Sequence, residues 1–178
     1  MNIRKANLHD IDRIAEIYEE IHTKEEAGRA SIGWIRGVYP TRQTAEAAVA
    51  RDDMFVMEIN DRIVAAARIN REQVTEYADA PWSVNAPADQ VMVLHTLVVS
   101  PSESGKGYAT EFVRFYENFA LEHDCPYLRM DTNAKNAAAR RLYRKLGYAE
   151  AGIVISQFNG IPDVPLVCLE KIVKREKA

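Results

Sequence analysis

Cysteine is scarce in this sequence of 178 residues, and charges of the two signs nearly balance. Cys125 and Cys168 are the only cysteines, and no Cys-x-x-Cys pair is present. We therefore expect two reduced, buried thiols and a cytoplasmic protein. The formal net charge of −3 argues against a dedicated nucleic-acid-binding protein, so no nucleic-acid partner is expected.

Long hydrophobic runs are also lacking. No stretch is long and apolar enough to span a bilayer, and no apolar run of a signal peptide follows the first five residues, so we expect no membrane partner. Hydrophobic residues make up 47% and charged residues 28%, the balance of a globular protein. The length favours one domain over residues 1–178.

Apolar periodicity and turn residues predict the order β-α-α-β-β-β-α-β-α-β-β, an α/β fold around a mixed sheet. Asp10 is expected to cap the first helix and Thr41 the second. Asn60-Asp61 is a hairpin signal. The strands are expected at residues 3–6, 54–59, 62–70, 91–99, 127–131, 148–155 and 163–173, and the later helices end near Glu122 and Leu146.

A glycine-bearing turn stands between the strand at 91–99 and the next helix. Gly105 and Gly107 allow the backbone to approach a phosphate closely, and free N–H groups at the helix start form a natural anion site. A tight turn without a ligand has the same glycines. A dinucleotide fingerprint is incomplete because Thr110 stands at its third glycine position, although Asp131 lies at a plausible distance for a ribose contact.

Residues 136–148 form the most informative segment. Asn136, Ala139 and Tyr143 share one face of a helix, and the small Ala139 would let a ligand pass close to it. The alternative is that Tyr143 packs in the core and that the basic residues 140, 141, 144 and 145 form a solvated face. Nucleic-acid binding through that basic run is disfavoured by the acidic total.

These two segments together resemble the GNAT superfamily of N-acetyltransferases. Family members carry Arg/Gln-x-x-Gly-x-Gly/Ala after the fourth strand, which here is residues 104–109, and Asn-x-x-Ala-x-x-Leu-Tyr-x-x-x-Gly-Phe/Tyr on a later helix, which here is residues 136–148. The second motif matches in full. In the first, the family's Arg or Gln is Ser104, a departure that bears on cofactor affinity and on how the loop is braced.

The resemblance implies a single-domain, mostly antiparallel sheet flanked by helices, with splayed fourth and fifth strands and acetyl-CoA as co-substrate. The pantetheine arm would lie in the gap, and Tyr143 would donate a proton or hydrogen bond to the departing sulfur. The implied cofactor-binding residues are Leu97, Val98, Val99, Ser104, Gly105, Lys106, Gly107, Tyr108, Ala109, Thr110, Asn136 and Ala139.

An amine acceptor is almost entirely protonated at neutral pH, so a base or a water chain must remove a proton. His95 is the candidate base, because we expect it to project from the same sheet face as Leu97 two residues later. A hydrogen-bonded structural histidine is the competing interpretation. No histidine has metal-ligand spacing, and no metal is expected.

The expected acceptor is a primary amine of a small molecule or peptide, attacked directly in a ternary complex. Its pocket would be built by the first helix pair and the final hairpin, where Arg29, Trp34, Tyr39, Phe158 and Asn159 either line it or belong to the core. The alternative functions are a non-catalytic acyl-CoA sensor and a nucleotide-binding oxidoreductase. The sequence is also compatible with a homodimer.

Overall fold

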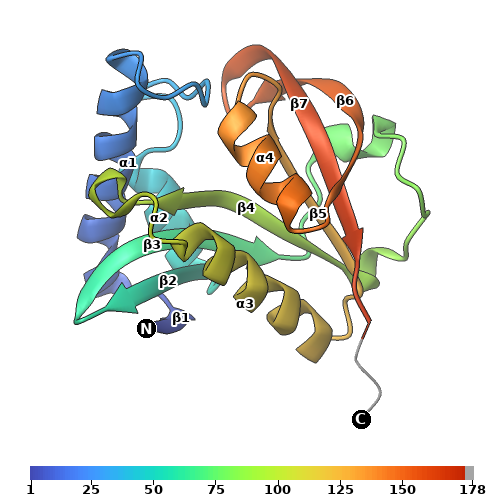
Figure 1. Ribbon diagram of the computed structural model, residues 1–178, viewed down its shortest axis with the longest axis horizontal. Coiled ribbons are helices and arrows are strands. Elements are labelled where there is room, and N and C mark those ends of the chain that lie inside the picture. Colours follow the sequence, from blue (N-terminus) through green and yellow to red (C-terminus); the bar gives the residue numbers. More distant parts are fainter. Residues whose placement is uncertain (175–178) are drawn as a thin grey trace.

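The computed structural model describes residues 1–174 and contains one mixed sheet of seven strands (Figure 1). The strand order is β1-β2-β3-β4-β5-β7-β6, and among these described strands only the β4–β5 pair is parallel. The strands are β1 (Asn2–Lys5), β2 (Met54–Ile59), β3 (Arg62–Asn70), β4 (Val91–Val99), β5 (Tyr127–Asn133), β6 (Ala149–Phe158) and β7 (Ile161–Ile172). The predicted fold class and element order are confirmed.

Four α-helices cover the two faces of this sheet in the described part of the chain. They are α1 (Ile11–Glu26), α2 (Arg42–Ala50), α3 (Tyr108–Glu122) and α4 (Ala137–Lys145). Phe112, Val113 and Tyr116 of α3 and Tyr143 of α4 pack on one face, and the isoleucines of α1 with Ala45 and Ala48 of α2 pack on the other. Each helix buries one apolar stripe, so the sheet is enclosed on both sides.

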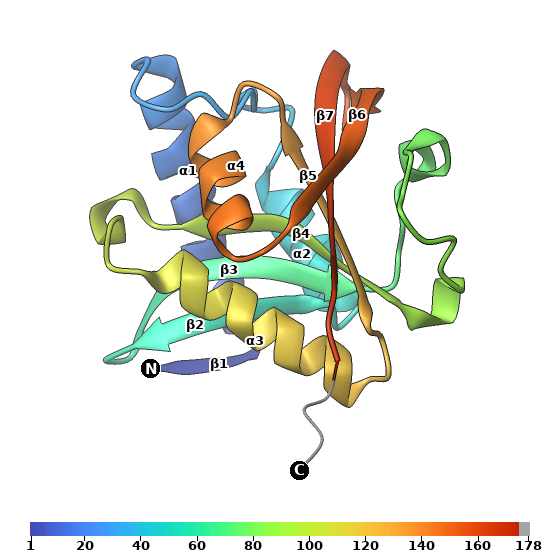
Figure 2. The same cartoon turned by 45° about the vertical axis from the view of Figure 1, so that its right-hand side comes forward.

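Strands β4 and β5 diverge after a short paired stretch, as Figures 1 and 2 both show. Their parallel register runs only from Val91 opposite Tyr127 to Leu94 opposite Met130. Beyond Leu94, β4 continues to Val99 beside β3, while β5 continues to Asn133 beside β7. The backbone groups of β4 that face β5 therefore lose their strand partner, which opens the predicted gap in the middle of the sheet.

A β-bulge interrupts β4 just where the gap begins. Opposite β3, Arg68 pairs with His95 and Ala66 with Val98, so Thr96 and Leu97 together oppose the single residue Ala67. Thr96 has a φ of 52°, an uncommon conformation for a β-branched residue. The extra residue shifts the alternation of side chains, so positions before and after the bulge follow different face patterns.

Some element ends differ from the sequence-based predictions. The prediction that Asp10 caps α1 is wrong: its side chain makes no cap bond to α1, and its carboxylate instead accepts hydrogen bonds from Arg4 and from the Asn7 amide. Strand β6 extends to Phe158 and β7 begins at Ile161, because Asn159-Gly160 forms a tight two-residue turn with positive φ at both positions. Thr41 caps α2 as expected, through a capping box.

Candidate active site

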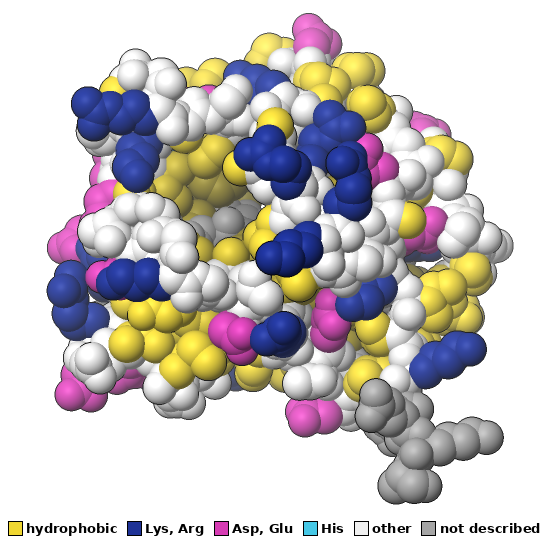
Figure 3. All heavy atoms as spheres, in the orientation of Figure 1, with side chains coloured by type: hydrophobic (Ala, Val, Ile, Leu, Met, Phe, Trp, Pro, Cys, Tyr) yellow, Lys and Arg dark blue, Asp and Glu magenta, His cyan; other side chains and the backbone are white. Residues whose placement is uncertain are grey.

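A cavity of about 290 Å³ lies between the diverging strands. Figure 3 shows the hollow on the protein surface, with a hydrophobic wall and Lys and Arg side chains on both sides. Its walls come from the C-terminal halves of β4 and β5, the start of α4, the end of α1 and the β6–β7 hairpin. Seven residues predicted for the site line it: Leu97, Val98, Val99, Ser104, Asn136, Ala139 and Tyr143.

The cavity receives side chains from both faces of the sheet. Leu94, Leu97 and Tyr143 belong to the cluster packed under α3 and α4. Phe158, Val164 and Leu166, which also line the cavity, belong to a cluster on the opposite side. A ligand in the gap can therefore be approached from two sides, and this is the geometry that a reaction between two substrates needs.

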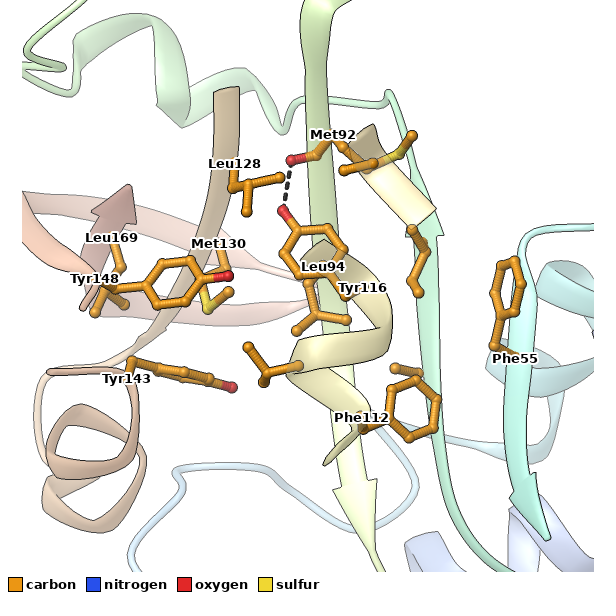
Figure 4. Close-up of a cluster of buried hydrophobic side chains, with 14 of the residues drawn as sticks. Phe55, Met92, Leu94, Phe112, Tyr116, Leu128, Met130, Tyr143, Tyr148 and Leu169 are labelled. Carbon is orange, nitrogen blue, oxygen red and sulfur yellow. Dashed lines mark hydrogen bonds between the residues drawn. The ribbon is translucent and has the colours of Figure 1, made fainter. Parts of the chain in front are cut away.

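Tyr143 presents its hydroxyl to this cavity while its ring is buried. The residue is 7% exposed and packs against Tyr148, with ring centroids 6.0 Å apart. Figure 4 shows the hydroxyl pointing away from α4, toward the side of β4 and α3. It has no hydrogen-bond partner among residues 1–174, and it is not sealed from solvent. Burial, followed by the charge of Asp131, raises the pKa of Tyr143, so the hydroxyl stays protonated and available as a donor.

The glycine turn offers a row of unpaired amides next to the cavity. Gly105 and Gly107 have φ values of 82° and 83°, in the left-handed region that favours glycine. None of the amides of residues 105–110 donates to another described residue; the first bond of α3 runs from the Glu111 amide to the Gly107 carbonyl. These six residues do not line the cavity, but Ser104, which precedes them, does. The loop is thus a ready anion site at the cavity's edge.

Short-range bonds brace this loop without the long side chain that the motif carries. The Ser104 hydroxyl donates to the Pro101 carbonyl at 3.0 Å, and Lys106 Nζ lies 2.6 Å from Glu103 Oε2. Ser104 therefore holds the turn closed from within.

Asn136 and Ala139 stand at the start of α4, as the helical spacing predicted. Asn136 Oδ1 accepts a hydrogen bond from the Ala139 amide at 3.2 Å and so caps the helix. Its side-chain amide nitrogen has no hydrogen-bond partner among residues 1–174 and can contact a ligand. The small Ala139 side chain leaves room beside the helix, and both residues line the cavity.

The prediction that His95 projects from the same face as Leu97 is wrong, because the bulge at Thr96 lies between them. His95 pairs with Arg68, on the side opposite Leu97, and its Nε2 lies 3.0 Å from Asn70 Oδ1. It does not line the cavity. Burial, with help from the positive charge of Arg68, lowers the pKa of His95 to about 3. The competing interpretation, a hydrogen-bonded structural histidine, matches this geometry.

Asp131 of β5 is the one acidic side chain among residues 1–174 that lines the cavity, and the sequence had not suggested a catalytic role for it. Tyr77 donates a hydrogen bond to Asp131 Oδ2 at 2.8 Å. Burial raises the pKa of Asp131 to about 6, the hydrogen bond from Tyr77 opposes this rise, and the charge of Glu76 adds to it. The only sequence signal was its position at the end of a strand next to the motif helix.

Of the aromatic residues expected near an acceptor, Trp34 and Phe158 line the cavity. Tyr39 is buried between them, with ring centroids 6.0 Å from Trp34 and 5.2 Å from Phe158, both in edge-to-face geometry. Its hydroxyl bonds to Thr96 Oγ1 at the bulge. The segment that carries Trp34 is anchored by Glu25, whose carboxylate accepts hydrogen bonds from the Ile32 and Gly33 amides.

Comparison with known proteins agrees with this architecture. A family model described as "Acetyltransferase (GNAT) family" matches residues 11–148. The streptothricin acetyltransferase of Escherichia coli is 28% identical over 81 residues, 46% of this chain and 47% of that protein, so this chain spans about half the length of the curated relative it matches.

Solved structures share the fold over nearly the whole chain. A GNAT-family acetyltransferase from Streptococcus agalactiae 2603 superposes with a TM-score of 0.81 at 23% identity, covering 98% of this chain and 96% of that one. A Salmonella typhimurium protein, solved with its cofactor acetyl-CoA, has a TM-score of 0.66 at 18% identity, covering 100% and 96%. None of the helices in residues 1–174 is long and apolar enough to cross a membrane.

The diverging β4 and β5, the glycine turn before α3 and the Asn136–Tyr148 motif all lie within residues 11–148, which the family model matches, and that match covers most of the sequence. The chain belongs to the GNAT family of acetyltransferases.

Proposed function

We propose that this protein moves the acetyl group of acetyl-CoA to a primary amine of a small molecule or peptide, by direct attack within a ternary complex. The observation that carries the proposal is a cavity lined from both faces of the sheet, with the Tyr143 hydroxyl on one side and loop amides at its edge, none of which has a hydrogen-bond partner among residues 1–174. Acetyl-CoA is the acetyl donor that the GNAT family uses, and the Salmonella structure was solved with it.

The cofactor side of the site fits a CoA thioester. Amides of residues 105–110 would bind the pyrophosphate, since each is free and the left-handed glycines bring the backbone close. Backbone groups of Leu97, Val98 and Val99 face the gap that β5 has left, and would bind the pantetheine arm and polarise the thioester carbonyl. The free nitrogen of Asn136 would contact the same arm, and Ala139 would leave room for it.

Tyr143 would stabilise the sulfur as the C–S bond breaks. Its raised pKa keeps the proton on the hydroxyl, so hydrogen-bond donation to the developing thiolate is favoured over complete proton transfer. Such an interaction exists mainly in the transition state and therefore accelerates the reaction rather than tightening cofactor binding.

The alternative, a non-catalytic acyl-CoA sensor, would need the same cofactor contacts but no acceptor space. The part of the cavity lined by Trp34, Phe158 and Leu166 provides such space on the side away from α4, which favours the enzyme.

The test is a free-thiol assay with acetyl-CoA and an amine panel made of streptothricin, phenethylamine and a peptide with a free N-terminus. Streptothricin is included because the Escherichia coli relative is named for it. We expect amine-dependent release of CoA and a higher Tm when acetyl-CoA is present. Binding of acetyl-CoA without release by any amine would favour the sensor, and binding of NAD in its place would overturn both.

A further inference from the structure

Asp131 is the first β5 residue beyond the parallel pairing with β4, so it stands at the apex of the gap. One carboxylate oxygen, Oδ2, accepts the Tyr77 hydroxyl at 2.8 Å. The other, Oδ1, has no hydrogen-bond donor within the described residues, and it is not sealed from solvent. Because Asp131 lines the cavity, that open oxygen is available to whatever enters there.

No positive charge in residues 1–174 pairs with this carboxylate, since Asp131 takes part in none of their salt bridges. Burial nevertheless disfavours its charged form and raises its pKa to about 6. An enclosed carboxylate without a cation is costly unless a ligand provides the opposite charge. The titratable groups that interact with it are neutral or acidic: Tyr39, Glu76, Tyr77, Tyr143 and Cys168.

The walls around Asp131 suit an organic cation. Trp34 and Phe158 offer aromatic rings, and Val164 and Leu166 are apolar. Among the described residues, Lys24 is the one basic residue that lines the cavity; it lies toward the glycine turn, with Nζ 3.5 Å from the Pro101 carbonyl. It is thus placed on the cofactor side and does not neutralise the acceptor side.

Asp131 and Tyr143 approach the gap from opposite sides of the sheet. Met130 packs in the cluster under α3 and α4 with Tyr143, so its neighbour Asp131 projects to the other face, where Tyr77 and Cys168 lie. A nucleophile held by Asp131 and a sulfur held by Tyr143 would lie on the two sides of one thioester carbonyl. This arrangement matches the proposed direct attack.

We propose that Asp131 binds the ammonium group of the acceptor and accepts a proton from it, and that the acceptor is a primary amine carried on an apolar or aromatic group without an adjacent acid. This inference rests on the proposed function. An acidic group beside the amine would be repelled by the charge of Asp131, and the charge of Glu76, which acts on Asp131, would add to that repulsion; we therefore expect selection against such amines.

The reaction balances without a further reagent. The ammonium gives one proton to the Asp131 carboxylate, and the nitrogen lone pair attacks the thioester carbon. A C–N bond forms and the C–S bond breaks. The nitrogen then loses a second proton, which neutralises the thiolate, so the products are the N-acetyl amine and CoA with a free thiol. Asp131 returns its proton to solvent. Apolar surroundings favour the neutral amine and carboxylic acid over the ion pair, which assists the first transfer.

The experiment compares Asp131→Asn with Asp89→Asn, a control that removes an exposed carboxylate outside the cavity. Asparagine keeps the size of Asp131 and can still accept the Tyr77 hydroxyl. Phenethylamine is the acceptor probe, and glutamate, an amine with an adjacent acid, is the contrasting probe. For Asp131→Asn we expect a loss of about 100-fold or more in kcat/KM for phenethylamine, unchanged acetyl-CoA affinity and a Tm at pH 7 no lower than that of the wild type. Asp89→Asn should match the wild type.

A second variant, Tyr77→Phe, tests the same carboxylate while retaining it. The Tyr77 hydrogen bond lowers the pKa of Asp131, so its loss should move the acidic limb of the kcat/KM profile to higher pH. An unchanged profile in Tyr77→Phe, or kcat/KM for Asp131→Asn within about threefold of the wild type, overturns the role of Asp131 while leaving the acetyltransferase proposal intact. Preference for glutamate over phenethylamine overturns the acceptor class. A wild type that releases no CoA with any amine refutes the proposed function, and this inference with it.

Discussion

Replacement of Tyr143 by phenylalanine separates the proposed catalytic role of this residue from its packing. The variant keeps the ring that contacts Tyr148 and removes only the hydroxyl that faces the cavity. Because this hydroxyl has no hydrogen-bond partner within residues 1–174, its removal breaks no described protein contact. We therefore expect a Tm close to that of the wild type and an unchanged affinity for acetyl-CoA.

The expected loss of rate follows from the raised pKa of Tyr143. An ordinary tyrosine with a pKa near 10 gives its proton to a thiolate of pKa about 8.5 only at a cost of roughly 2 kcal/mol, and burial increases this cost. The hydroxyl therefore acts as a hydrogen-bond donor. A hydrogen bond to a charged group contributes about 1.5–3 kcal/mol. At about 1.36 kcal/mol per factor of ten, the variant should lose roughly 10- to 150-fold in kcat.

The matched control is Tyr148→Phe. Tyr148 packs beside Tyr143, but its hydroxyl is buried, has no hydrogen-bond partner in the described part of the chain and does not line the cavity. Removing an unsatisfied buried hydroxyl should leave kcat unchanged and should keep or raise the Tm. Both variants would be measured for Tm, acetyl-CoA affinity and kcat with the amine that the wild type prefers.

The result that refutes the reasoning is a Tyr143→Phe enzyme with near-wild-type kcat, when pre-steady-state kinetics show that chemistry limits the rate. Equal losses in both variants would assign the effect to ring packing. A loss confined to acetyl-CoA affinity would show that the Tyr143 hydroxyl contributes to ground-state binding of acetyl-CoA and not to transition-state stabilisation.

Three further predictions concern the loop, the cavity wall and pH. Gly107→Val should weaken acetyl-CoA binding, measured by calorimetry, more than Ser104→Ala does, because Gly107 has a φ of 83° and Ser104 only bonds within the turn. Equal losses of affinity in the two variants would show that the pyrophosphate does not bind at this loop. Gly33→Ala should lower both the Tm and kcat/KM for the amine, because a Cβ there would lie 2.4 Å from Asn133 Nδ2; unchanged values would show that the segment yields freely. In the folded protein the pKa of Asp131 is about 6, above its ordinary value of 3.8. The free energy of unfolding should therefore fall by about 3 kcal/mol as pH rises from the ordinary pKa through the folded one. Urea unfolding of Asp131→Asn should lack this component of the pH dependence, and kcat/KM of the wild type should fall as pH drops below about 6; identical unfolding profiles for the two proteins would contradict the raised pKa.

The sequence by itself determined the order of the elements and the family. Both depend on local patterns: the glycines of the turn, the apolar stripe of α3 and the spacing of Asn136, Ala139 and Tyr143 on one helix face. Helical spacing depends on residues within a few positions of one another, so the face that they share does not depend on how the sheet is arranged. For the same reason the hairpin turn at residues 60–61 was recognisable.

Tertiary structure alone decided which polar groups meet in the cavity. Strand alternation predicted a shared face for His95 and Leu97. The bulge at Thr96 inserts an extra residue between them, and the local sequence did not predict this bulge. Asp131 is a candidate catalytic residue only because the parallel pairing of β4 with β5 stops at Leu94 and Met130. Its contact with Tyr77 joins residues 54 positions apart. Sheet register and long-range contacts of this kind depend on the packing of the whole sheet, and the pKa of a buried carboxylate depends on all that surrounds it.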